Sequence, residues 1–515
     1  MKSSTNKWII AFTVMFPTLM VIVDTSIVNV SLDHIRGSLS AGIDEATWSI
    51  TSYLAANAII IPMTGWLGRI YGRKRVLITS VIMFSLSSLF CGLAWNIESL
   101  VVFRILQGLA GGSLQPISQS ILLETFPPHQ HGTAMAVFGI GIMFGPIVGP
   151  VLGGWITDNW TWHWIFYINI PVGVISVLLA QVFIEDPHYI RTMKMKIDYW
   201  GLAFLAVGVG CLQLVLDRGQ RLDWFSSYFI MVLAALSLIT LILFVIVESL
   251  TEHPIVNLGI LKNYSFSLGN IVVFFVLFNL FGSIVLLPVY LQNLMGYTSL
   301  LSGLVLMPGG LAALVAMPIA GILISRINPK IIIVIGLVLL AYSTYLMSLF
   351  NQHADFVTIL LPRFFMGFGI GLTMVPLFTL TLSHIRKEEM GNATSIFNLM
   401  RNLGGSFGVA FSATLLTRRA QFHQVRLVDH LTPFDMTYWW GAHRAADALQ
   451  IRGFEETLTS QGGLAVIYGK LLKEASMLSF NDVFYFLACL SILMLPLVLA
   501  MKYIRYKAPE ITETK

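Results

Sequence analysis

Apolar runs of about 20 residues recur along almost the whole chain, with only short polar breaks between them. A hydrocarbon layer about 30 Å thick needs about 20 apolar residues for each helical crossing, because a helix rises about 1.5 Å per residue. Of the 515 residues, 56% are hydrophobic and 11% are charged, whereas soluble domains are about 25% charged. We therefore predict an all-α integral membrane protein.

The apolar runs predict fourteen transmembrane helices. The first run follows lysines and could be taken for a signal peptide, but it lacks a small-residue cleavage site, contains Asp24 and precedes many further spans, so we predict that it is retained. The predicted spans are 8–30, 48–68, 76–96, 99–123, 133–156, 163–185, 198–217, 227–247, 266–291, 302–324, 331–350, 356–379, 393–416 and 480–502.

The distribution of Lys and Arg predicts the orientation of these spans, because basic residues in short loops stay on the cytoplasmic side. With the amino terminus inside, eighteen basic residues fall in cytoplasmic segments and three, Arg36, Arg218 and Arg221, in short outer loops. We therefore predict that both termini are cytoplasmic. The long polar stretch 417–479 then lies outside, as an ordinary loop or as a surface on which a partner docks.

Two short motifs recur in the second part of the chain at nearly the same offset, 256 or 259 residues. We therefore predict two six-helix halves, 1–190 and 261–515, separated by a two-helix insert with a cytoplasmic linker at 191–260. Transporter halves repeated in this way enclose a central site. The matched segments are Pro62–Leu67 with Pro318–Leu323, and Arg104, Gly108 and Gly112 with Arg363, Gly367 and Gly371.

Asp24 and Arg104 are the leading functional candidates, because an ionisable group inside a span costs about 2.5–3.5 kcal/mol on insertion scales. Asp24 lies about 24 Å along the first helix from the inside, and Arg104 about 8 Å along the fourth from the outside, so the two are expected at similar depth. A carboxylate beside a cation in a low-dielectric cavity is suited to loading and releasing a proton. The alternatives are that Asp24 marks the outer interface or caps a loop, and that Arg104 tethers helix ends.

Five further charged residues lie within spans or near their ends. Arg363, at the repeat position of Arg104, and Arg401, inside the thirteenth span, either hold helices together through backbone carbonyls or contact cargo. We expect Asp217 and Glu248 to mark interfaces, and Glu124 to extend toward water at a cytoplasmic helix end.

Glycines and prolines form a second pattern, in the fifth span. Small residues every fourth position let another helix approach closely, and prolines bend a helix. The pattern predicts a hinge or a tightly packed gate, with generic helix packing as the alternative. Its members are Gly141, Gly145, Pro146, Gly149, Pro150 and Gly153.

Enzyme and metal chemistry find little support in the sequence. The pair His129 and His131 has no third ligand nearby, so we predict a solvated turn there, and we find no nucleophile and base pair and no phosphate loop. We predict no metal, no cofactor and no nucleic-acid partner.

These motifs resemble the EmrB/QacA-type branch of the major facilitator superfamily over about residues 15–415, and the Thr47–Trp66 stretch is most like EmrB-type members. The resemblance implies the major facilitator fold with fourteen helices. It also implies proton coupling by Asp24 in a first-helix signature that includes Asn29, and proton transfer at the fourth-helix motif. The resemblance further implies that the loop motif latches the conformational cycle and that the fifth-helix run is the motif found in exporters. The motif residues are Gly65, Arg69, Gly72, Arg73 and Lys74 in the loop, and Arg104, Gln107 and Gly108 in the fourth helix.

The chain departs from the family pattern at two places, Arg69 and the stretch His129-Gln130-His131, which replaces a charged pair often seen after the two prolines. The loop motif usually carries an acidic residue where this chain has Arg69, so a latch based on that carboxylate cannot be assumed for this chain.

Asn29, Arg363 and Arg401 are candidates for lining a substrate cavity.

The resemblance implies proton-driven efflux of amphipathic drugs by alternating access, in the inner membrane of a Gram-negative envelope. It also implies an EmrA-like periplasmic adaptor and an outer-membrane channel as partners. The alternatives are a proton-coupled uptake symporter, which the fifth-helix run and the helix count disfavour, and a channel or a membrane-embedded enzyme. The cargo is left open by the sequence.

Overall fold

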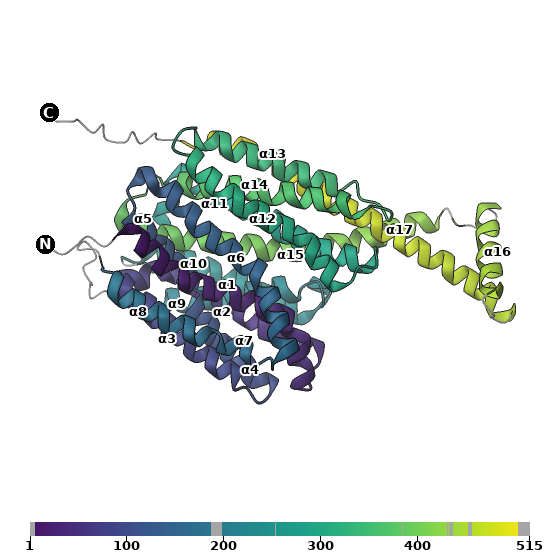
Figure 1. Cartoon of the computed structure of the whole chain (residues 1–515), viewed down its shortest axis with the longest axis horizontal. Coiled ribbons are helices and arrows are strands. Elements are labelled where there is room, and N and C mark those ends of the chain that lie inside the picture. The colour runs from purple at the N-terminus through teal and green to yellow at the C-terminus, as the bar shows by residue number, and fades with distance from the viewer. Residues whose placement is uncertain are drawn as a thin grey trace.

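The computed structural model describes residues 6–186 and 198–502, apart from 253, 384, 430, 432–435 and 452–455, and all its regular elements there are helices. Figure 1 shows two bundles side by side, with α16 (Met436–Ile451) at the far end of the molecule from the start of α1 (Lys7–Ser38). We call α1–α8 the N-terminal bundle and α11–α18 the C-terminal bundle. The domain limits predicted from the repeat stay a prediction.

The N-terminal bundle follows the predicted spans, with two breaks. The predicted span 99–123 is two helices, because the chain turns at Gly112 and Ser113, and the predicted span 163–185 is divided at Ile168. Polar caps set some starts: Asn96 accepts a hydrogen bond from the Ser99 amide at 2.8 Å. The helices are α1 (Lys7–Ser38), α2 (Ile43–Tyr71), α3 (Arg73–Gly92), α4 (Ile97–Gly111), α5 (Leu114–Thr125), α6 (His131–Asn159), α7 (Trp164–Tyr167) and α8 (Asn169–Phe183).

The insert consists of α9 (Tyr199–Arg218) and α10 (Tyr228–Leu250), which pack on each other. Helix α9 also contacts α2 and α15, so the insert adjoins both bundles. In the most apolar stretch of α10 only 22% of the residues are buried. Such an exposed apolar helix is expected to face lipid.

The C-terminal bundle corrects the prediction for residues 417–479. This stretch is largely helical where it is described, because α15 continues to Val428 and α17 begins at Glu456. Both helices run well past the bundle, and α16 lies across the tip (Figure 1). The helices are α11 (Tyr264–Asn293), α12 (Ser299–Leu323), α13 (Pro329–Met347), α14 (Phe356–Leu382), α15 (Met390–Val428), α16 (Met436–Ile451), α17 (Glu456–Leu493) and α18 (Leu495–Ala500).

Side-chain bonds hold together the parts of α15 and α17 that run past the bundle. Asp482 on α17 accepts hydrogen bonds from Arg419 Nε and His423 Nε2 on α15, each at 2.6 Å. Farther out, Gln424 Nε2 donates to the Tyr468 hydroxyl at 2.9 Å. The described parts of the segment predicted as a polar loop are therefore helices, and α15 and α17 are bonded to each other.

Twelve helical segments in the described part of the chain are long and apolar enough to cross a membrane. The two other predicted spans, 133–156 and 393–416, are also helical, as parts of α6 and α15, but they are not among the twelve. The multi-pass helical architecture is confirmed, and the count of fourteen stays a prediction.

The two bundles contact each other through α6 with α12, and through α2 and α5 with α15. These contacts involve the carboxyl-terminal part of α2 and the amino-terminal parts of α6 and α15. Gly65 N on α2 donates to Ser395 Oγ on α15 at 2.9 Å, for example. All of these segments lie at the end of the molecule where α1 begins (Figure 1). The bundles are therefore closed against each other at the end that the charge distribution predicts to be cytoplasmic.

Candidate functional site

Asp24 of α1 and Arg104 of α4 form an ion pair inside the N-terminal bundle. Arg104 Nη1 donates to Asp24 Oδ2 at 2.7 Å, and both residues are buried, with exposed fractions of 0% and 1%. This contact confirms that the two residues lie at the same depth. It also contradicts the alternatives of a loop cap or an interface marker for Asp24.

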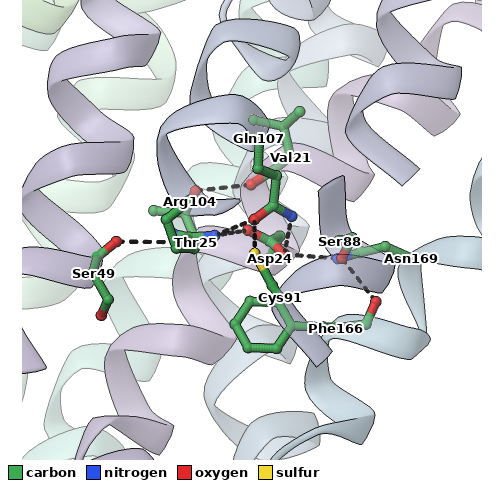
Figure 2. Close-up of polar contacts among 10 residues, drawn as sticks. All are labelled: Val21, Asp24, Thr25, Ser49, Ser88, Cys91, Arg104, Gln107, Phe166 and Asn169. Carbon is green, nitrogen blue, oxygen red and sulfur yellow. Dashed lines mark hydrogen bonds and ion pairs between the residues drawn. The ribbon is translucent and has the colours of Figure 1, made fainter. Parts of the chain in front are cut away.

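Two amides complete the shell of the Asp24 carboxylate (Figure 2). Gln107 Nε2 and Asn169 Nδ2 donate to Asp24 Oδ1 at 3.0 and 2.7 Å. Gln107 Oε1 in turn accepts from Arg104 Nη1 at 2.7 Å. Asp24 therefore has one charged and two neutral donors, which compensate for its burial.

Aromatic rings and a backbone carbonyl fix the Arg104 guanidinium. Its Cζ lies 4.0 Å from the centre of the Tyr53 ring and 5.9 Å from that of Phe166. Its Nε donates to the Ser49 carbonyl at 3.1 Å. Arg104 therefore also joins helices, as the tethering alternative proposed, but it does so while paired with Asp24.

Several members of this cluster escaped the sequence reasoning. Asn169 lies in α8 and also donates to Ser88 Oγ of α3 at 3.0 Å, and Cys91 Sγ donates to Gln107 Oε1 at 3.6 Å. A polar amide such as Asn169 inside a predicted span was a usable signal. Ser88 and Cys91 carried none, since small polar residues are common in transmembrane helices.

The repeat-equivalent position in the C-terminal bundle lacks the acid. The offset of 259 residues that takes Arg104 to Arg363 also takes Asp24 to Ser283 and Gln107 to Met366. Met366 Sδ accepts from Arg363 Nη1 at 3.0 Å and from Ser283 Oγ at 3.2 Å. The repeat-equivalent residues thus also meet, but through the Met366 sulfur and without a direct bond between Ser283 and Arg363. Of the two copies, the N-terminal one has a carboxylate that can take up a proton.

The three candidates for a substrate cavity lie apart. Asn29 is exposed on α1, and Arg363 is buried in α14. Arg401 is partly buried on α15, and its Nη2 donates to Gln115 Oε1 of α5 at 2.5 Å. Of the three, Arg401 is the one that bonds across the two bundles.

The loop motif around Gly72 contains a second buried ion pair. Arg73 pairs with Glu124 of α5, and both side chains are 6% exposed. The expectation that Glu124 extends toward water was wrong, because Arg73 compensates its charge inside the protein. Gly72 has φ +85°, and the Lys74 amide donates to Asp186 Oδ1 at 2.9 Å.

Arg69, one of the two departures from the family pattern, lies near two acids. Its charge interacts with Glu389 before α15 and with Glu248 at the end of α10. Glu248 is 4% exposed and is therefore buried rather than a surface marker. The loop position of Arg69 thus carries a cation within electrostatic range of acids on neighbouring elements.

Removing one partner of the buried loop pair should destabilise the protein. We expect Arg73→Ala to lower the unfolding free energy by about 3–5 kcal/mol, because Glu124 is left charged and buried. Thermal unfolding in detergent measures this loss, and Arg75→Ala, at an exposed neighbouring arginine, is the control. The double variant Arg73→Ala with Glu124→Ala should recover much of the stability. Equal melting of Arg73→Ala and the wild type would contradict the prediction.

The glycines of α6 form the tightly packed contact with α1. A Cβ at Gly141 would lie 2.9 Å from Met15 Cε, at Gly149 2.5 Å from Ser26 Cβ, and at Gly153 3.2 Å from Ile27 Cγ2. The glycine stripe therefore brings α6 against the helix that carries Asp24. The side chains of Pro146 and Pro150 lie outside the described part of the structure, so a hinge there stays a prediction.

Metal chemistry finds no support in the described part of the chain, where no group of three or more His, Cys, Asp or Glu side chains is arranged to hold an ion. His131 Nε2 instead lies 3.0 Å from the Phe126 carbonyl, and His129 is beside Gln130 at 3.2 Å.

The fold and the site together define a membrane transporter built from two helical bundles with a buried ion pair. Residues 14–409 match the sequence pattern of the Major Facilitator Superfamily, and the chain belongs to this family. It is a transporter and not an enzyme.

Curated relatives and solved structures agree with this assignment. The chain is 35% identical to the fatty acid resistance protein FarB of Neisseria gonorrhoeae, over 93% of each chain. It is 34% identical to the multidrug export protein EmrB of Escherichia coli K12, over 93% of this chain and 92% of that protein. A double-tryptophan mutant of XylE matches 96% of this chain and 95% of its own, with a TM-score of 0.64 and 14% identity, which shows the fold.

Proposed function

We propose that this protein exports amphipathic compounds in exchange for protons, by alternating access across the bacterial inner membrane. The observation that carries the proposal is the buried Asp24 carboxylate, held by Arg104, Gln107 and Asn169. In the described part of the chain, this carboxylate of α1 lies inside the bundle, and its donors belong to two other helices, α4 and α8. A rearrangement of these helices would change the donors around the Asp24 carboxylate and hence the affinity of this carboxylate for a proton.

The exchange depends on competition between a proton and Arg104 for the Asp24 carboxylate. Protonation of Asp24 from outside removes the charge that Arg104 neutralises, which weakens the contact of α1 with α4. Helix α6 is packed on α1 through its glycines and contacts α12 of the other bundle. A shift of α1 therefore displaces α6 and alters the contact between the bundles. Proton release on the inside then restores the ion pair.

The names of the relatives support export. EmrB is named a multidrug export protein and FarB a fatty acid resistance protein. We propose that both termini are cytoplasmic. We also propose that the hairpin of α15 and α17, with α16 at its tip, meets a periplasmic adaptor and an outer-membrane channel. No cofactor is required, since the proton gradient drives the cycle.

Reconstituted liposomes test the exchange directly. When the vesicle interior is made acidic, vesicles that contain the wild-type protein should accumulate a cationic dye such as ethidium. When no pH gradient is imposed, dye added outside should drive proton efflux from the vesicles. A symporter would instead move dye and protons in the same direction. A channel would move dye without any coupled proton movement, and either result would refute the proposal.

A further inference from the structure

The two oxygens of the Asp24 carboxylate have different surroundings among the described residues (Figure 2). Oδ1 accepts two hydrogen bonds, from Gln107 Nε2 at 3.0 Å and from Asn169 Nδ2 at 2.7 Å. Oδ2 accepts one, from Arg104 Nη1 at 2.7 Å. A carboxylate oxygen has room for about two hydrogen bonds, so the described residues saturate Oδ1 and leave one position on Oδ2. A proton is therefore expected to bind at Oδ2, on the side of Arg104.

Ser88 fixes the orientation of the Asn169 amide. The Ser88 hydroxyl donates its single proton to the Phe166 carbonyl at 2.8 Å, beside the break between α7 and α8. Because that proton is engaged, Ser88 Oγ can only accept, and it accepts from Asn169 Nδ2 at 3.0 Å. The second N–H of the same amide nitrogen is directed at Asp24 Oδ1. A rotated amide would place its carbonyl oxygen against the carboxylate, so Asn169 is held as a donor to Asp24.

The break in the predicted span 163–185 gives Asn169 this position. Asn169 is the first residue of α8, and from there its side chain bonds to both α1 and α3. Asn169 is 2% exposed and Ser88 is 0% exposed, so both bonds are shielded from bulk water. A hydrogen bond to a charged group in a buried, low-dielectric site is stronger than the same bond in water. The contact with Asn169 therefore stabilises the charged form of the Asp24 carboxylate.

Other ionisable groups around Asp24 come from several helices. Arg104 of α4 is the charged one in contact with it. Cys91 of α3 and Tyr53 of α2 also interact electrostatically with Asp24, and thiols and phenols are mostly neutral at physiological pH. The helices packed on α1, and α1 itself, carry their other described ionisable side chains toward their ends, and α8 carries none. These side chains are Lys7, Asp33, His34 and Arg36 of α1, Glu45, Arg69 and Tyr71 of α2, Glu124 of α5, His131 and Asp158 of α6, and Tyr167 of α7. Asn169 therefore acts on Asp24 as a neutral donor whose own state does not change with pH.

We propose that Asn169 is a positioning residue for proton exchange, which holds Asp24 Oδ1 and stabilises the charged carboxylate so that Oδ2 takes up and later releases the proton. In uptake, a proton from water on the outer side forms an O–H bond with Oδ2, and no other covalent bond changes. Arg104 stays protonated and keeps its bond to Gln107 Oε1, while its attraction to Asp24 is lost. In release, the Asn169 and Gln107 donors favour the return of the negative charge. This inference rests on the proposed proton exchange and deepens it.

An infrared titration of the purified protein tests the role of Asn169 without any transport. The C=O band of the protonated Asp24 carboxyl, identified by its absence in Asp24→Asn, is followed against pH. We expect Asn169→Ala to raise the midpoint of this titration by at least about one pH unit, because a donor to the charged form is lost. The isosteric Asn169→Asp keeps the packing and should raise the upper midpoint further, since a second carboxylate then lies beside Asp24. Ser88→Ala should raise the midpoint less, because it frees the Asn169 amide without removing it.

Asn279→Ala is the matched control, because it removes another buried asparagine far from Asp24. Asn279 is 1% exposed in the C-terminal bundle and donates to the Leu487 carbonyl and to Ser491 Oγ. Its loss should lower the melting temperature and leave the midpoint of the Asp24 titration unchanged. In liposomes, Asn169→Ala should shift the pH profile of ethidium-driven proton movement by the same amount as the infrared midpoint.

Two results would overturn the proposal. An unchanged midpoint in folded Asn169→Ala and Asn169→Asp would show that the amide does not stabilise the charged carboxylate. A loss of activity in Asn169→Ala without any shift of the pH profile would show that Asn169 only packs the helices, as Asn279 does. A shifted midpoint together with no proton-coupled transport by the wild-type protein would instead support the position of Asn169 and refute the proposed function.

Discussion

Asp24→Asn should abolish substrate-driven proton movement in liposomes, a loss of at least about tenfold that reaches the background of empty vesicles. An amide cannot take up and release a proton, and in the described part of the chain the repeat-equivalent cluster around Arg363 has a serine where this acid stands. Passive equilibration of dye down its own gradient should persist, because the bundles and their contacts remain. The measurement is proton flux, followed with a pH-sensitive dye, on addition of ethidium.

This substitution also removes the counter-charge of Arg104, so stability must be measured beside transport. Breaking a buried pair costs about 3–5 kcal/mol. The double variant Asp24→Asn with Arg104→Gln replaces both charges by amides and should melt closer to the wild type than Asp24→Asn alone, while still failing to move protons. Asp24→Glu should keep part of the coupling. Wild-type proton flux in a folded Asp24→Asn protein would refute the assigned role.

Gly65→Val should shift the transporter away from the state described here. A Cβ at Gly65 would lie 2.6 Å from the Asn392 backbone nitrogen and 2.7 Å from the Gly391 carbonyl carbon, on α15 of the other bundle. Backbone atoms cannot rotate away, so α2 and α15 must separate at this end. Overpacking costs about 1–3 kcal/mol, which corresponds to a change of about 5- to 150-fold between two conformations.

The shift has a direct structural readout. Spin labels at Tyr71 on α2 and Lys387 before α15, both exposed, should report a longer distance in Gly65→Val than in the parent protein. We expect export to fall at least about fivefold with little change in melting temperature, because the clash is relieved when the bundles part. Gly154→Val is the matched control, since a Cβ there would meet no atom within 4 Å. An unchanged distance would show that this contact does not close the inner end.

The fold was largely predictable from the sequence, because membrane solvation leaves few choices. Apolar runs of this length must be helices, since unpaired backbone groups cannot be left in lipid. The positions of Asp24 and Arg104 along their helices were enough to predict a common depth. Breaks such as the turn at Gly112 were missed, because glycine in an apolar run indicates close packing as often as a break.

The stretch 417–479 shows where composition misleads. Its polarity indicated a loop, yet α15 continues to Val428 and is bonded to α17 through Asp482. A polar helix outside the membrane has no long apolar run, and its stability comes from side-chain pairs with a distant segment. Such pairs can be identified only in the tertiary structure, which shows how the two helices pack.

By itself, the sequence determined that the protein is embedded in a membrane, that it is helical, and which few charged residues lie within its spans. Each of these follows from local composition and spacing. The tertiary structure alone decided which of those charges are neutralised. Arg104 meets Asp24, and Arg73 meets Glu124, whereas Arg401 meets the neutral Gln115 of the opposite bundle. Pairing depends on which helix faces are packed together across long sequence separations, and the energies that choose those faces are sums over many small contacts between helices.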